Sequence, residues 1–334
     1  MIEGFELSFI AGFLLTILPR ITRTDPTGAG VTNSALALLV GFGAAALVGQ
    51  LAVAHGCALL LLLLLAAVMA RRLRARRNDP PEEIVFAPFG LVLGVAGAAL
   101  QLAASAGWIV EPAPRLGIRL MSLGMVLAFV LGFGTLLVPV FLEIKDPLVI
   151  PRIARPHERP RRRALYLALA LGIVLTFAAD SFGAGAVGAF GRAVFASLML
   201  GLGWKIWRRP GRRTFPAVVL WSSGWLIGAG LWAAALLPAH EVAALHVVLL
   251  GGFATLTLAI ASRVVVTHGG HGPDGEARLV TPARAALLAV ALLARLAAEA
   301  DPAHGPAWLA AAATAWILAW AGWYVAARTL LRAV

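Results

Sequence analysis

The sequence predicts an all-α fold, a polytopic membrane bundle of about eleven transmembrane helices that forms a single integral membrane domain over residues 1–334. Two observations lead to this fold class. Hydrophobic residues make up 60% of the chain and charged residues 13%, whereas soluble domains are closer to half apolar and a quarter charged. The segment from Ser34 to Ala70 contains no charged residue, and it is too long for one bilayer-spanning helix of about 20 residues.

Apolar windows separated by basic residues place the predicted spans along the chain. The spans lie near residues 5–18, 34–53, 56–70, 84–109, 118–142, 164–180, 186–206, 216–237, 240–265, 282–299 and 306–327. The second and third spans are separated only by the junction Ala54-His55-Gly56. With this number of spans, the two termini lie on opposite sides of the membrane.

Three strongly basic loops set the predicted orientation, because loops rich in Lys and Arg stay on the cytoplasmic side. Their cations are Arg71, Arg72, Arg74, Arg76 and Arg77, then Lys145, Arg152, Arg155, Arg159 and Arg161 to Arg163, then Lys205, Arg208, Arg209, Arg212 and Arg213. All three loops fall on one side, which predicts a cytoplasmic C-terminus and an external N-terminus. A first span that enters from outside is hard to insert alone, so we expect coding sequence before Met1 to supply one more hydrophobic helix, ending in one or two histidines.

Composition and motifs exclude several classes of protein. The net charge of +12 does not indicate nucleic-acid binding, because the arginines form short blocks between apolar segments rather than a continuous stripe. The single cysteine, Cys57, excludes an internal disulfide, a thiolate zinc site and an iron–sulfur cluster. The chain contains no P-loop, nucleophile elbow or dinucleotide fingerprint. No catalytic residue therefore emerges from the sequence.

Histidine is the most informative residue type, and His246 is the strongest candidate ligand. It lies about two turns inside the ninth predicted span, where a polar side chain is costly without a partner or a ligand. A hydrogen bond to a neighbouring helix is one interpretation, and axial ligation of a haem iron is the other. His268 is a second candidate metal ligand on the same helix face, but it lies roughly 33 Å along the axis, so any metal site there is separate from one at His246. His55, beside the second span, is a further candidate metal ligand.

Two arginines near the external ends of their spans, Arg192 and Arg295, are candidates to bind an anionic group such as a haem propionate. Pairing of either arginine with Asp180, at the end of the sixth span, is the alternative. A transporter of a small molecule or metal complex is the alternative function, with Gln50, Asp180 and His246 along its path.

The segment from Leu245 to Gly270 resembles the signature helix of the NnrS family, which has a His, a Gly-rich middle with Thr-Leu, an Arg-Val pair and a second His. The segment Gly12-Phe13-Leu14-Leu15-Thr16, followed by Pro19, is similar to that family's second helix. The resemblance covers nearly the whole chain. In the family, histidines open the second helix just before this segment, a position that here lies at or before Met1.

The resemblance implies a twelve-helix bacterial inner-membrane protein associated with haem, sometimes with copper, and with the response to nitric oxide. It implies that His246 is an axial haem ligand. With one more helix before Met1, a Gly-Phe pattern near residues 12–19, 132–139 and 252–257 predicts three units of four helices, an arrangement similar to the catalytic subunit of haem-copper oxidases. Close helix packing at these glycines is the alternative interpretation. The copper centre of those oxidases needs three histidines on middle helices, which are absent here, so oxygen reduction is not expected.

Overall fold

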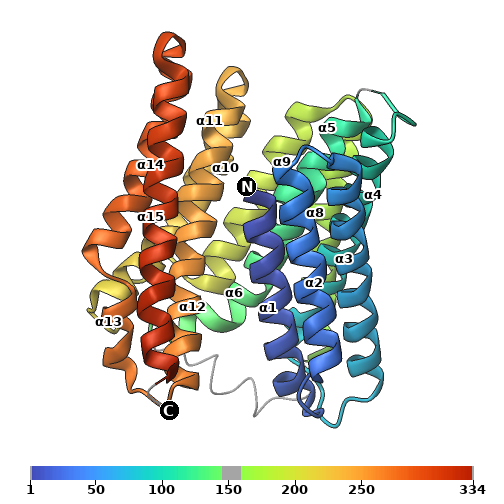
Figure 1. Cartoon of the computed structure of the whole chain (residues 1–334). Helices are drawn as coiled ribbons and strands as arrows, with labels where there is room; N and C mark the ends of the chain where they lie inside the picture. Colours follow the sequence, from blue (N-terminus) through green and yellow to red (C-terminus); the bar gives the residue numbers. More distant parts are fainter. Residues whose placement is uncertain (1, 111, 145–158, 333–334) are drawn as a thin grey trace. The chain divides into compact units, whose positions relative to one another are not determined.

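The computed structural model of the chain describes residues 2–110, 112–144 and 159–332, and these residues form helices joined by short turns, with no strand (Figure 1). Ten of the described helical segments are long and apolar enough to cross a membrane. The predicted fold class, an all-α polytopic bundle, is therefore confirmed. The helices group into two compact units, Met1–Leu136 with Arg152–Gly191 (unit 1) and Leu137–Pro151 with Arg192–Val334 (unit 2).

Unit 1 is built around α3, which packs against α2, α4 and α1. Its helices are α1 (Ile2–Thr22), α2 (Ala29–Leu47), α3 (Leu51–Arg74), α4 (Phe86–Ser105), α5 (Ala113–Ile118), the π-helical segment Arg119–Met125, most of α6 (Val126–Phe141), α8 (Arg159–Ser181) and the start of α9 (Gly185–Leu198). Leu61, Leu62 and Leu65 on α3 are almost completely buried. The opposite face of α3 exposes Leu60 and Leu63, as expected for a helix that faces lipid.

Unit 2 consists mainly of the C-terminal helices. They are α10 (Phe215–Leu236), α11 (Glu241–His246), the π-helical segment Val247–Ala254, α12 (Thr255–His268), the short α13 (Glu276–Leu279), α14 (Pro282–Ala300) and α15 (Gly305–Arg332). α14 and α15 lie side by side, and α10 packs against the π-helical segment and α12. Part of the core is formed by Val219, Leu258 and Leu288, with the indoles of α15 packed against them.

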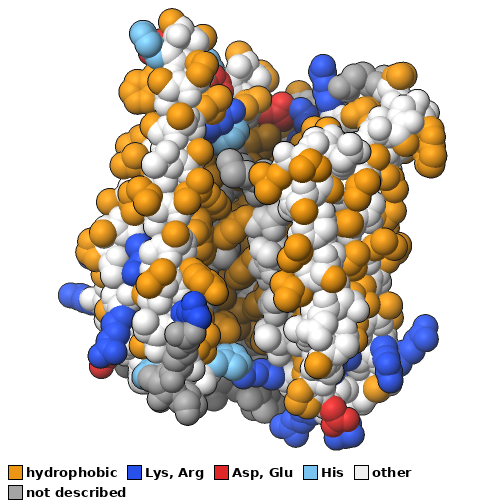
Figure 2. Space-filling view, viewed as in Figure 1, with side chains coloured by type: hydrophobic (Ala, Val, Ile, Leu, Met, Phe, Trp, Pro, Cys, Tyr) orange, Lys and Arg blue, Asp and Glu red, His pale blue; other side chains and the backbone are white. Residues whose placement is uncertain are grey.

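Figure 2 shows hydrophobic side chains over the flanks of the helices, whereas many of the Lys and Arg side chains lie near helix ends. Exposed large hydrophobic residues occur throughout both units, among them Val92, Leu175, Leu293 and Ile317. A soluble monomer rarely exposes so much contiguous apolar surface, so these faces are suited to contact with lipid chains.

The structure corrects two details of the predicted spans. The junction between the second and third spans is not Ala54-His55-Gly56 but the turn at Gly49, between the end of α2 and the start of α3. Gly49 has a φ of 74°, a left-handed conformation that glycine adopts readily and that ends the helix there. The predicted span 282–299 does form a helix, α14. This helix is not one of the ten apolar segments, because it contains the charged residues Arg284, Arg295 and Glu299. The single domain and the three four-helix units stay predictions.

Candidate functional site

His246 lies at the junction of two kinds of helix in unit 2. It is the last residue of α11, and the π-helical segment Val247–Ala254 begins at the next residue. Its side chain is partly buried. A π-helical stretch widens the backbone ladder locally, and such stretches occur frequently at functional sites.

Both ring nitrogens of His246 have a hydrogen-bond partner. Nδ1 lies 2.6 Å from the carbonyl oxygen of Val242, one turn earlier, and this contact requires a proton on Nδ1. The Nε atom of Arg295 on α14 donates to Nε2 at 3.1 Å, so Nε2 carries a lone pair. The contacts therefore define a neutral imidazole with its proton on Nδ1.

A second polar pair also connects the start of α11 with α14. Nδ1 of His240 lies 3.2 Å from a carboxylate oxygen of Glu299, which follows Arg295 by one turn on α14. Sequence reasoning missed Glu299, although its i, i+4 spacing from Arg295 places both on one helix face and was the available signal. The polar site of unit 2 thus consists of His240, His246, Arg295 and Glu299.

The other histidines proposed as metal ligands have local partners. His55 is 8% exposed, and its Nδ1 lies 2.9 Å from the hydroxyl of Ser105, which itself donates to the carbonyl of Gln101. This contact joins α3 to α4. His268 is exposed at the end of α12, with Nδ1 2.7 Å from the carbonyl of Val264. Among the described residues, no group of three or more His, Cys, Asp or Glu side chains could hold a metal ion.

The charged residues proposed to bind an anionic group or to pair with each other have different partners in the structure. Asp180 forms an ion pair at 3.4 Å with Arg119 of unit 1, and Arg295 contacts His246 instead. Arg192 is 3% exposed on α9 and has interaction partners of its own. Gln50 is exposed in the turn before α3. The binding of a propionate by Arg192 or Arg295 stays a prediction.

A buried carboxylate marks the other end of unit 2. Glu276, which opens α13, is 7% exposed, and Arg263 and Arg212 form ion pairs with it at 2.5 and 3.9 Å. The guanidinium of Arg263 also lies over the ring of Phe141, 5.0 Å from its centre. Burial raises the pKa of Glu276, and this effect exceeds the opposite influence of Arg263 and Arg212, while Asp274 raises the pKa further.

The raised pKa of Glu276 predicts a pH-dependent stability of definite sign. Because the folded protein binds this proton more tightly than the unfolded chain, the contribution to stability is complete below the ordinary pKa of 4.5 and is lost as the pH rises through the raised pKa. We expect the free energy of unfolding, measured by denaturation with dodecyl sulfate in mixed micelles, to fall over this range. Glu276→Gln should remove that part of the slope; an unchanged slope in this variant would contradict the assignment.

These features define a class, a polytopic helical membrane protein with a polar site around a neutral histidine. The family model described as NnrS protein matches residues 1–333, and the chain therefore belongs to the NnrS family. The resemblance to this family noted in the sequence is thus confirmed. Neither the curated proteins nor the solved structures compared with the chain give a match.

Proposed function

We propose that this protein is a haem-binding NnrS protein of the bacterial inner membrane that acts in the response to nitric oxide and nitrosative stress. The observation that carries the proposal is the hydrogen bonding of His246 within the family's signature segment. Histidines that ligate metals almost always donate the other ring N–H to a carboxylate, a carbonyl or water, which orients the ring and raises its basicity. The Val242 carbonyl supplies this contact for Nδ1 of His246, and Nε2 is the atom with the lone pair.

The residues present could hold a haem. His246 would hold the iron through Nε2 after the Arg295 side chain turns away from that atom. The released guanidinium would then suit a propionate, because Arg presents several donors to a carboxylate, and Arg192 is the second candidate for this role. Haem, when bound, supplies an iron centre that can take a diatomic gas such as nitric oxide. Copper is a further metal associated with the family.

The test of this proposal is the absorption spectrum of the purified protein, prepared with haem supplied during expression and normalised to protein. A stoichiometric haem band supports the proposal. A protein that takes up no haem, with its helical content intact, would favour the alternative of a transporter for a small molecule or metal complex. One observation favours that alternative: α14 places Arg295 and Glu299 among membrane helices, and polar residues there often mark a transport path.

The proposal includes an orientation with the C-terminus in the cytoplasm. It rests on the basic loops, since Lys and Arg in short loops remain inside. Reporter fusions after Arg77, Arg163 and Arg213 are expected to give cytoplasmic signals, and fusions near Glu111 or Pro238 external ones. An external signal from the fusion after Arg163 would contradict this orientation.

A further inference from the structure

The five arginines between Arg71 and Arg77, at the end of α3, differ in what they contact. Arg72 donates three hydrogen bonds to residues 24–27, at 2.6 to 3.1 Å. Arg76 and Arg77 form ion pairs with aspartates at 3.5 and 3.9 Å. The side chains of Arg71 and Arg74 have no hydrogen bond or ion pair within the described part of the chain. Two of the five guanidinium groups thus remain available to an external anion.

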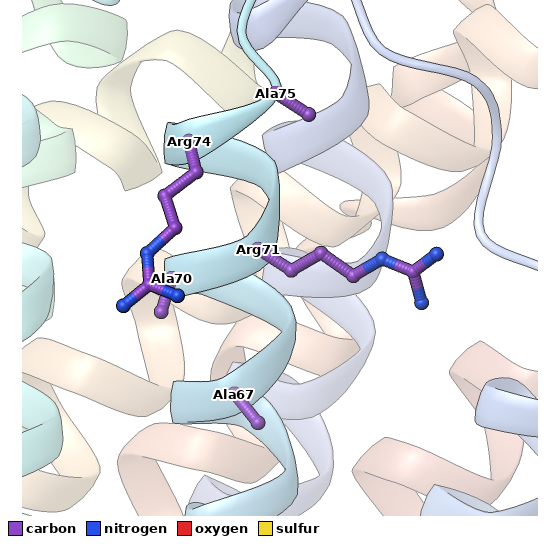
Figure 3. Close-up of a pocket in the computed structure, with 5 residues that line it drawn as sticks. All are labelled: Ala67, Ala70, Arg71, Arg74 and Ala75. Atoms are coloured by element: carbon purple, nitrogen blue, oxygen red, sulfur yellow. The ribbon is translucent and has the colours of Figure 1, made fainter.

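The two available arginines border a hollow on the surface of α3 (Figure 3). Its floor consists of Ala67, Ala70 and Ala75, and Arg71 and Arg74 leave the helix on opposite sides of it. The spacing of these five residues places them on one face of the helix, and all five are exposed. Small side chains between two long cationic ones leave room for a group that approaches the helix closely.

The hollow lies between an apolar and a polar surface. Toward the middle of α3 the same face continues with Leu63 and Leu60, which are 46% and 57% exposed. In the other direction Arg74 also lines a polar hollow, which it shares with Arg76, Arg77, Asn78, Asp79 and Arg159. Along this face, the apolar residues come first, then the two arginines, then the polar hollow. The acyl chain, the phosphate and the headgroup of a phospholipid follow one another in the same order.

We propose that this face of α3 binds an anionic phospholipid, with the phosphate between Arg71 and Arg74 and an acyl chain along Ala67 and Leu63. Guanidinium groups match phosphate oxygens in geometry and charge, and anionic lipids are attracted to basic residues at the end of a membrane helix. The α3 segment Leu51–Arg74 is one of the ten apolar segments, which places these arginines at its end. The site is independent of haem binding.

Native mass spectrometry of the detergent-purified chain, titrated with phosphatidylglycerol or phosphatidylcholine, tests the proposal. We expect Arg71→Gln with Arg74→Gln to weaken phosphatidylglycerol binding about tenfold or more and to leave phosphatidylcholine binding unchanged. Arg71→Lys with Arg74→Lys should retain most of the binding, because lysine also attracts phosphate. Ala67→Leu with Ala70→Leu, which fills the hollow and keeps the charge, should weaken it as the glutamines do.

The matched control removes the same charge elsewhere in unit 1. Arg161 and Arg163 on α8 are also exposed, and they lie outside both hollows, so Arg161→Gln with Arg163→Gln should bind phosphatidylglycerol as the wild type does. Equal losses in the α3 and α8 variants would show attraction by net charge alone and would overturn the site. Undiminished binding in the α3 glutamine variant, or in the leucine variant, would overturn it as well.

Discussion

Replacement of His246 by alanine is expected to abolish the haem content of the protein or to reduce it well over tenfold, while the chain still inserts into the membrane. Insertion depends on apolar helix length, which this substitution does not change. Loss of Nε2 removes the proposed bond to iron, and no other His lies within one turn of that position on α11 or the π-helical segment. The measurement is the absorption spectrum normalised to protein, with haem supplied during expression.

The matched control is His268→Ala. His268 also donates from Nδ1 to the carbonyl four residues earlier, as His246 does, but it lies roughly 33 Å away along the helix. Its replacement should leave the haem spectrum intact. If His246 served only to bond Arg295, its loss would cost roughly 0.6–2 kcal/mol and would leave haem content unchanged. That outcome would remove the main support for the haem proposal.

The second large effect is expected at Gly230, where α10 meets α11 and the π-helical segment. A Cβ at this position would lie 2.7 Å from Cγ2 of Val248 and 2.9 Å from both the carbonyl oxygen of Ala244 and the amide nitrogen of Val248. Backbone atoms cannot yield as the end of a flexible side chain can. Gly230→Ala is therefore expected to lower the free energy of unfolding by about 2 kcal/mol, measured by denaturation with dodecyl sulfate in mixed micelles.

Gly228, two residues earlier on the same helix, provides the control. A Cβ there would meet only Cδ1 of Leu200 at 3.5 Å, an ordinary contact. Gly228→Ala should therefore leave stability unchanged or raise it by less than about 1 kcal/mol, since alanine favours helix. Equal effects of the two substitutions would show that close packing at Gly230 does not matter. Because Ala244 and Val248 flank His246, the Gly230 variant should also bind less haem.

The sequence by itself determined the fold class and the candidate ligand. A bilayer imposes the same two requirements on every span. The apolar run must be long enough to cross, and the helix must satisfy the hydrogen bonds of its own backbone, so each span can be predicted from local composition. The same reasoning singled out His246, because a polar residue in such a run is conspicuous. The segment from Leu245 to Gly270, which resembles the signature helix of the NnrS family, was also local and could be recognised without the structure.

Only the tertiary structure decided which polar groups meet. Arg295 and His246 lie 49 residues apart, and their contact depends on how α14 packs against α11. Asp180 contacts Arg119, which sequence reasoning did not single out. The turn at Gly49 was also missed, since one glycine in a long apolar run resembles any other until its φ is known. Apolar residues are interchangeable in lipid, so hydropathy carries no information on which helices become neighbours, and the pairing of side chains follows from packing alone.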